Sequence, residues 1–267
     1  KSTIDIDTGS LIRLNGNRGY GHIVMQEITD LLIDRARKHG IVAVAAYNLD
    51  PAGRFADFCD RAADEGIATF MFFNLSGGYK AVAAPGGTEA RIATNPLAAG
   101  VPQAHGPNIV IDMATSAVAE GRLNDSKERN LEVDSEWVNK NGNLVSMGGV
   151  KGFALAVMIE ALAGSLTGAG TVGYDAVDYR QGVFAIGIDI QKLRPLADFE
   201  EDVTKFVQYL KESPLEPGAG PITMPGERTA INKEKRLRDG IPIHNAIWAQ
   251  LEDLASQFDV QLPQTVA

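Results

Sequence analysis

Two stretches of this sequence pair charged or hydroxyl side chains with backbone that could hold an anion. In IDMATSAVAEGR, a predicted strand ends at Asp112, and Thr115 or Ser116 is predicted to open a helix. The free N–H groups of that helix and the neighbouring hydroxyl groups could bind a phosphate or a ribose. In GGVKGF, Lys151 follows a glycine turn at the predicted start of a helix, so its charge and the helix dipole both favour an anion.

A third stretch, MPGER, presents the backbone of Pro225 and Gly226 beside the carboxylate of Glu227, which could bond ribose hydroxyl groups. Taken singly, each of the three stretches has an ordinary explanation as a capped helix or a tight turn. Together they favour an anionic ligand.

The stretch AYNLDPAGRF, residues 46–55, lies between an apolar run, IVAVAA, and a helix-like segment, FADFCDRAADEG. Asn, Asp, Pro and Gly packed this tightly predict a turn. A strand end that turns into a helix is where α/β enzymes often carry reactive groups. The stretch is therefore either a catalytic loop or only a corner.

Other apparent motifs do not carry chemistry. GAGTVG, residues 168–173, matches G-x-G-x-x-G, but it follows a predicted helix and leads into a polar loop, whereas a dinucleotide fingerprint follows a strand and opens a helix. It is interpreted as a turn at a helix end. No P-loop is present. The histidines, which are far apart and lack an i+4 partner, give no support for a metal site; they are His22, His39, His105 and His244.

The elements that would position these residues alternate between strand and helix patterns. Helices are predicted at residues 21–39, 52–65, 148–168, 196–212 and 228–238 and in HNAIWAQLEDLASQF, and strands at 41–47, 67–74, 108–114 and 182–190. Residues 75–107 are predicted to be mostly loop, and 124–147 a surface excursion with an Asn-Gly turn. This order predicts an α/β or α+β fold with a layered sheet.

Composition narrows the function classes. The chain has 267 residues, 45% hydrophobic and 22% charged, with a net charge of −9. The negative charge argues against a nucleic-acid backbone or an anionic membrane surface as partner. The run FALAVMIEALAG carries Glu160 and is too short to span a bilayer. The only cysteine, Cys59, excludes an internal disulfide, and we expect a cytoplasmic protein.

Six segments in a fixed order resemble the type 2 malate/L-lactate dehydrogenase family, whose members reduce 2-keto acids, cyclic imines and related substrates. The segments cover about two-thirds of the chain, and DMATS, TNP and KG are the most specific elements. They are PGG (85–87), ATNPLAAGVP (93–102), IDMATSAVAEGR (111–122), GGVKGFALAVMIEALAGSLTGAG (148–170), MPGER (224–228) and DGIPI (239–243).

The resemblance implies an oxidoreductase that uses NAD or NADP without a Rossmann fold and acts on a small 2-oxo or 2-hydroxy acid or a cyclic imino acid. It implies a layered α/β/α fold with a mixed sheet, like that of L-sulfolactate dehydrogenase. Apart from the resemblance, the scattered histidines and the single cysteine predict no metal site. The residues that fall on the family's cofactor-binding stretches are Thr94, Asn95, Asp112, Ala114, Thr115, Ser116, Lys151, Gly152, Pro225, Gly226 and Glu227.

The resemblance also implies a domain division and an assembly. A cofactor-binding domain, residues 77–222, is expected to be inserted in a dimerisation and substrate domain made of residues 1–76 and 223–267. Members of the family are usually homodimers with the site near the subunit interface. The expected partners are therefore a small-molecule substrate and a second copy of the chain.

The sequence departs from the family where a proton donor is expected. Hydride transfer to a carbonyl needs such a donor, most often histidine. One family motif, Ser-His-Gly, lies upstream of the first resembling residues. The other, an Asn-Ser-x-His-Phe-Gly loop, falls on AYNLDPAGRF, where the histidine position meets Asp50 or Pro51. An ordinary exposed aspartate, with a pKa of about 3.9, is a poor acid at neutral pH.

Two hypotheses follow from this departure. In the first, the protein is a nicotinamide-dependent reductase that uses another acid: Asp112, Asp50 or His22, although His22 has an ordinary explanation as a residue that caps or opens the first helix. In the second, the catalytic histidines are lost, and the chain is a nucleotide-binding protein or catalyses a non-redox reaction, as a lyase or isomerase, on the same scaffold.

Overall fold

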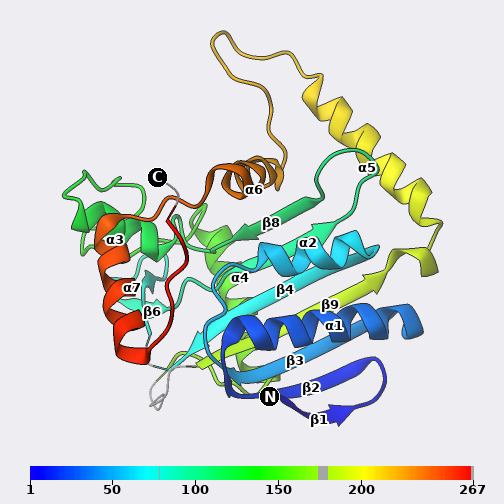
Figure 1. The fold of residues 1–267 in the computed structure, drawn as a ribbon, viewed down its shortest axis with the longest axis horizontal. Helices are drawn as coiled ribbons and strands as arrows, with labels where there is room; N and C mark the ends of the chain where they lie inside the picture. The colour runs from blue at the N-terminus through cyan, green and yellow to red at the C-terminus, as the bar shows by residue number, and fades with distance from the viewer. Residues whose placement is uncertain (78, 174–179, 266–267) are drawn as a thin grey trace. The chain divides into compact units, whose positions relative to one another are not determined.

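The computed structural model describes residues 1–77, 79–173 and 180–265 (Figure 1). The chain forms two compact units, Lys1–Pro225 and Gly226–Ala267. The second unit contains helices α6 (Glu227–Asp239) and α7 (Asn245–Phe258). All the other elements belong to the first unit.

The first unit begins with two strands, then alternates helix and strand, and continues with a run of consecutive strands. Its strands are β1 (Thr3–Asp7), β2 (Leu11–Gly19), β3 (Ile41–Leu49), β4 (Ile67–Ser76), β5 (Val82–Ala83), β6 (Ala90–Ile92), β7 (Leu97–Val101), β8 (Ile109–Met113) and β9 (Arg180–Asp189). Its helices are α1 (Gly21–His39), α2 (Ala56–Asp64), α3 (Glu120–Glu128), α4 (Val150–Ile159) and α5 (Leu196–Lys211), with a π-helix η1 (Glu160–Leu166) that continues α4 and a short 3-10 helix η2 (Ile190–Lys192).

The main sheet has seven strands in the order β1-β2-β3-β9-β4-β7-β8. Strands β2 and β3 pair parallel, whereas the other neighbours pair antiparallel. Rossmann folds are built on a mostly parallel sheet, so this mixed sheet is a different architecture. The predicted non-Rossmann α/β fold with a mixed sheet is confirmed.

Helices cover both faces of the sheet. Helix α1 packs on β3 and β9, and α2 packs on β4 and β7, whereas η1 packs on β4 and β9. In Figure 1, α1 and α2 lie in front of the sheet and α4 lies behind it. The front layer buries the largest apolar cluster, which includes Met25, Ile28, Leu32 and Phe73. The predicted α/β/α layering is therefore confirmed.

Several boundaries differ from the predictions, for identifiable reasons. Strand β7 lies in the segment predicted to be mostly loop, because its sequence LAAGV has little strand propensity and pairs through β4 and β8 instead. Strands β1 and β2 were not predicted. No helix opens at Thr115 or Ser116, and α3 begins only at Glu120. The helix predicted from residue 52 begins at Ala56, after the Asp-Pro turn.

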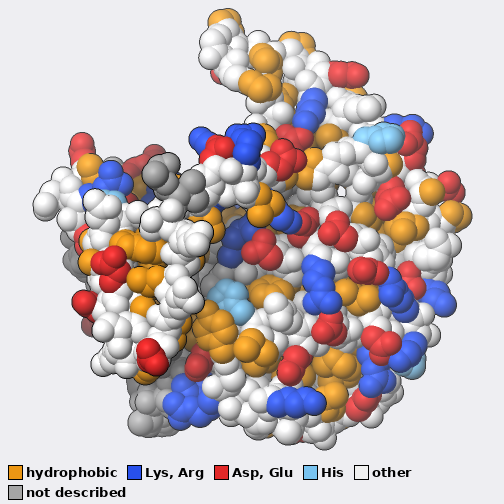
Figure 2. All heavy atoms as spheres, in the orientation of Figure 1, with side chains coloured by type: hydrophobic (Ala, Val, Ile, Leu, Met, Phe, Trp, Pro, Cys, Tyr) orange, Lys and Arg blue, Asp and Glu red, His pale blue; other side chains and the backbone are white. Residues whose placement is uncertain are grey.

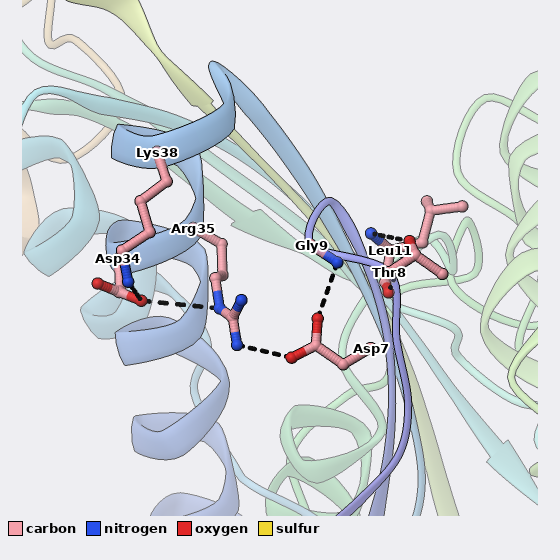
Figure 3. Close-up of polar contacts among 7 residues, drawn as sticks. All are labelled: Asp7, Thr8, Gly9, Leu11, Asp34, Arg35 and Lys38. Atoms are coloured by element: carbon pink, nitrogen blue, oxygen red, sulfur yellow. Dashed lines mark hydrogen bonds and ion pairs between the residues drawn. The ribbon is translucent and has the colours of Figure 1, made fainter.

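Polar contacts join the turn between β1 and β2 to the end of α1 (Figure 3). One Asp7 oxygen accepts from the Gly9 N–H at 2.8 Å, and the other accepts from Arg35 at 2.6 Å. On the same helix, Lys38 donates to Asp34 at 2.7 Å. This end of α1 is thus a surface network of paired charges.

Side chains of both signs are spread over the surface. Figure 2 shows acidic and basic side chains interspersed on one face of the molecule, with apolar side chains between them. A polyanion would require a basic stripe or patch, and the face in Figure 2 does not present one.

Candidate functional site

The corner at residues 46–55 packs against the start of α1. Strand β3 ends at Leu49, and the Asp50 N–H donates to the Gly19 carbonyl at 3.1 Å. A Cβ on Gly21 would lie 2.7 Å from the nitrogen and Cα of Ala52 and closer still to the Asp50 carbonyl oxygen. Only glycine allows the two backbones to approach this closely. Gly21 therefore fixes the corner against the first turn of α1.

His22 faces this corner. A Cβ built on Gly53, which has a φ of +68°, would lie 3.3 Å from both Cε1 and Nε2 of the His22 ring. The His22 ring also stacks on the Tyr20 ring, and the two centroids lie 5.1 Å apart. Helix α1 has Tyr20 at its N-cap and no side-chain cap, so His22 does not cap the helix. The structure brings an exposed imidazole to the place where the corner turns.

Asp50 points toward a cation from another strand. Its Oδ1 lies 3.9 Å from Nη1 of Arg180, the first residue of β9. Next to Arg180, the Gln181 side chain accepts from the Ala52 N–H at 3.1 Å. The first two residues of β9 thus contact the corner through an ion pair and a hydrogen bond. Neither Arg180 nor Gln181 is recognisable from the sequence as a neighbour of residues 50–52.

Asp112 joins the DMATS stretch to the same corner. Its Oδ2 accepts from the N–H groups of Phe55 at 2.8 Å and Ala56 at 2.9 Å. These groups lie at the start of α2, which has no side-chain cap of its own. A carboxylate at a helix N-terminus satisfies free donors and complements the dipole. Asp112 on β8 therefore acts as a helix cap supplied from a distant strand.

Thr115 and Ser116 tie loops together. The Thr115 hydroxyl donates to the carbonyls of Thr94 and Asn95, each at 3.0 Å, and its N–H also donates to Thr94. The Ser116 hydroxyl donates to the Val118 carbonyl at 2.7 Å. Both residues are buried. Ala114, half-buried, connects them to β8. The predicted role for these hydroxyls as a helix cap is wrong, because the protein's own carbonyls take their hydrogens.

Asn95 lies in the centre of a buried polar cluster. Its Nδ2 donates to the Ala156 carbonyl at 3.1 Å and to Glu160 at 2.9 Å, while its Oδ1 has no partner among the described residues. Glu160 also accepts from Asn74 at 3.3 Å and from the Val172 N–H at 3.2 Å. These donors satisfy the buried carboxylate. The cluster fixes the TNP loop to α4 and η1.

The glycine turn before α4 has the predicted form. Gly148 and Gly149 have φ values of +56° and +62°, and a Cβ on either would meet nothing within 4 Å. A Cβ on Gly152 would lie 2.7 Å from the Thr115 carbonyl oxygen. The first turn of α4 therefore packs directly on the turn at residues 112–116, which we call the DMATS turn. Lys151 is exposed beside this contact. The arrangement combines a helix N-terminus, open backbone and a cation, which suits an anion.

The MPGER stretch crosses the boundary between the two units. The Pro225 carbonyl accepts from the Val110 N–H at 3.3 Å, which places Pro225 beside β8 in the first unit. Gly226, with a φ of +97°, is the N-cap of α6, and Glu227 is its first residue. The cofactor contacts predicted for Gly226 and Glu227 stay a prediction.

Metal and thiol chemistry find little support in the described part of the chain. Within it, no three His, Cys, Asp or Glu side chains are grouped so that they could hold a metal ion. Burial raises the pKa of the Cys59 thiol to about 12, which keeps it protonated and unreactive. No helix in the described ranges is long and apolar enough to cross a bilayer.

The comparison with known proteins gives one consistent answer. The family model described as malate/L-lactate dehydrogenase matches residues 1–252. The L-lactate dehydrogenase of Cupriavidus necator is 32% identical over 97% of this chain and 79% of that protein. The L-sulfolactate dehydrogenase of Methanothermobacter thermautotrophicus is 29% identical over the same shares.

A solved structure agrees with the sequence matches. The malate dehydrogenase of Pyrococcus horikoshii superposes with a TM-score of 0.85 at 29% identity, covering 98% of this chain and 78% of that one. The relatives are hydroxy-acid dehydrogenases, which supports a redox reaction on small acids.

Proposed function

The chain belongs to the malate/L-lactate dehydrogenase family, and we propose that it is an NAD- or NADP-dependent oxidoreductase of small 2-oxo and 2-hydroxy acids. One observation carries this proposal. The contacts of Asp112, Thr115 and Gly152 connect three segments: the corner, the DMATS turn and the glycine turn at residues 148–151, which we call the Lys151 turn. These are the segments on which the family resemblance rests. A cyclic imino acid is the second substrate class that the resemblance offers.

The residues of the Lys151 turn fit a nicotinamide cofactor. The cofactor's phosphates need a cation, which Lys151 supplies at an exposed turn with open space around Gly148 and Gly149. The buried and unpartnered oxygen of Asn95, next to half-buried Thr94, is an acceptor for a polar group in the same region. When bound, such a cofactor supplies a hydride for the reaction. We propose no preference between NAD and NADP.

The predicted cofactor residues are proposed to have different roles. Lys151, with the backbone of Gly148 and Gly149, is proposed to contact the cofactor. Thr115 and Ser116 have hydroxyl groups that bond the protein itself, so they are proposed to shape the site. Asn95 bonds the protein through Nδ2, and its Oδ1 is the proposed acceptor. Gly152 is proposed to let α4 approach the DMATS turn. Asp112 is proposed to position the corner rather than to donate a proton, since its Oδ2 accepts two N–H groups.

A second copy of the chain is proposed to cover the outer face of α4. This helix carries apolar side chains on its exposed side as well as its buried one: Val150, Leu155, Val157 and Met158 are 69%, 40%, 45% and 55% exposed. A helix that is apolar all round is normally buried. A homodimer would cover this face. If it does, Met158→Glu should give a monomer in sedimentation experiments.

The expected domain division also stays a proposal. A separate apolar cluster within residues 77–222, which includes Val82, Ile92, Leu123 and Leu144, supports a cofactor-binding domain there. A reducing compartment such as the cytoplasm suits a chain whose only cysteine, Cys59, is free and buried.

Titration with NADH and NADPH, followed by nicotinamide fluorescence, tests the proposed function. We expect binding of at least one cofactor, and about 10- to 100-fold weaker binding to Lys151→Ala, because a hydrogen bond to a charged group contributes about 1.5–3 kcal/mol. Lys140→Ala, which removes a charge from the exposed turn at residues 139–143, is the matched control and should leave the affinity unchanged. Absence of binding of either cofactor by the wild-type protein would refute the proposal.

A further inference from the structure

A carbonyl reductase needs a proton donor, and the four histidines of the chain are placed very differently. His39 lies at the opposite end of α1 from His22, His105 lies in the loop that contacts α5, and His244 belongs to the second unit. Among the three histidines of the first unit, only His22 lies at the corner that Asp112 joins to the DMATS turn. Within this unit, geometry therefore selects one imidazole.

The His22 ring packs against neighbouring residues but makes no polar contact among the described residues. The ring stacks on Tyr20, and its Cε1 and Nε2 edge lies close to Gly53. Any side chain at position 53 would crowd the Cε1 and Nε2 edge of the ring, and glycine avoids this contact. Within the described ranges the imidazole makes no hydrogen bond or ion pair, and the residue is exposed. The ring can therefore donate a proton to a substrate and regain it from solvent.

The other acidic groups at the corner have different partners. Asp112 accepts two N–H groups, and Asp50 faces Arg180. Arg54, which also belongs to the corner, forms an ion pair with Asp57. Neither carboxylate is placed as freely as the imidazole.

We propose that His22 is the catalytic proton donor for the reduction of a 2-oxo acid, an inference that rests on the proposed function. Reduction adds a hydride to the carbonyl carbon, the C=O π electrons move to the oxygen, and the nicotinamide is oxidised by the same electron pair. The N–H bond of the His22 imidazolium breaks as the O–H bond of the 2-hydroxy acid forms. The neutral imidazole then takes a proton from water.

A cyclic imino acid makes a chemical control, because its protonated nitrogen already carries the proton of the product. Hydride addition to the iminium carbon gives the neutral amine, and no proton transfer from the enzyme is required in that step. The role of His22 therefore predicts different losses for the two substrate classes. A residue that only stabilises the fold would affect both substrates equally.

His22→Gln tests the proposal in the full chain. We expect NADH affinity to stay within about threefold and kcat for a 2-oxo acid to fall by about 10²- to 10⁴-fold, the usual contribution of a general acid. In mildly acidic buffer, reduction of a cyclic iminium substrate should fall by less than about tenfold. His39→Gln, at the other end of the same helix, is the matched control and should retain the activity of the wild type.

Two further measurements keep the test decisive. Thermal unfolding checks that His22→Gln folds like the wild type, and added imidazole should partly restore 2-oxo acid reduction by His22→Ala. A kcat of His22→Gln equal to that of the wild type would overturn the assignment. So would an equal fall of kcat for both substrate classes, together with no recovery of His22→Ala activity in added imidazole. If the wild-type protein binds cofactor but reduces no 2-oxo acid, the proposed function fails instead, and the two failures are distinguishable.

Discussion

The two ends of helix α1 use the same local arrangement in different surroundings. At each end a histidine ring lies against a glycine with positive φ: His22 against Gly53, and His39 against Gly9, where a Cβ would lie 3.1 Å from the ring. Around His39, Asp7, Arg35, Asp34 and Lys38 pair with one another at the surface (Figure 3). Basic residues in that last turn also suit the helix dipole.

The end at His22 is held by distant parts of the chain instead. It lies against the corner after β3, which the end of β2, β8 and the start of β9 contact in turn. Besides the ion pair between Asp50 and Arg180, these contacts use backbone groups and the side-chain acceptors of Asp112 and Gln181. A histidine ring beside a glycine is therefore not by itself a catalytic site. What distinguishes the His22 end is the convergence of four segments, and the predictions below test that difference.

The largest effect is expected for Gly21→Ala. The new Cβ would collide with the backbone of Asp50 and Ala52, which cannot yield as a flexible side chain can. We expect a loss of about 3 kcal/mol in the free energy of unfolding, typical of overpacking, and a fall in kcat of about 10²-fold from the displaced corner. Urea unfolding and NADH oxidation measure the two quantities.

Gly9→Ala is the matched substitution at the other end of α1. It strains a positive φ and crowds the His39 ring, so about 1 kcal/mol should be lost, while kcat should not change. Equal losses of kcat in the two variants would show that the ends of α1 do not differ in function.

Asp112 substitutions are expected to have an intermediate effect. Asp112→Ala removes the acceptor for two N–H groups at the start of α2, which should cost about 1–2 kcal/mol of stability. Asp112→Asn keeps an acceptor oxygen and should recover most of the stability and most of kcat. A proton donor would behave differently: Asn would then abolish kcat as completely as Ala does, with the fold intact.

The smallest effect is expected from Asp34, in the paired charges near His39. The hydrogen bond from Lys38 holds the pKa of Asp34 below its ordinary value of 3.8. Because the folded pKa is lowered, the associated stability is present above the unfolded pKa and is lost as the pH falls through the folded pKa. Carboxyl chemical shifts in an NMR titration should show the low pKa in the wild type and an ordinary one in Lys38→Met. An unchanged pKa in that variant would contradict the pairing.

Much of the fold can be predicted from periodicity. The helical spacing of residues 21–39 predicts α1 with the bounds that the structure has, and the β-branched run of NIVIDMA predicts β8. The sequence LAAGV gives no comparable signal for β7, because small residues serve there to let the strand approach α2: a Cβ on Gly100 would lie 2.9 Å from the Cys59 carbonyl oxygen. Such an approach depends on tertiary packing, which periodicity does not encode.

The candidate site is predictable only in parts. The Lys151 turn follows from its glycines, and Glu160 is conspicuous as a carboxylate in an apolar helix, a signal for buried donors such as Asn95. In contrast, 57 residues separate Asp112 from Phe55, and their contact depends on the order of strands in the sheet. The same holds for His22 and Gly53. Neither pair carries a local pattern that would reveal it.

The central claim, that the chain is a nicotinamide-dependent oxidoreductase of small 2-oxo acids, is tested most directly by turnover. The wild-type protein would be mixed with NADH or NADPH and a series of 2-oxo acids, including pyruvate, oxaloacetate and sulfopyruvate, while the absorbance of the reduced nicotinamide and the formation of the 2-hydroxy acid are followed. We expect equimolar cofactor oxidation and 2-hydroxy acid formation with at least one of these 2-oxo acids, at a kcat above about 1 s⁻¹. Cofactor binding without oxidation across the whole series would contradict it and favour a nucleotide-binding protein on the same scaffold.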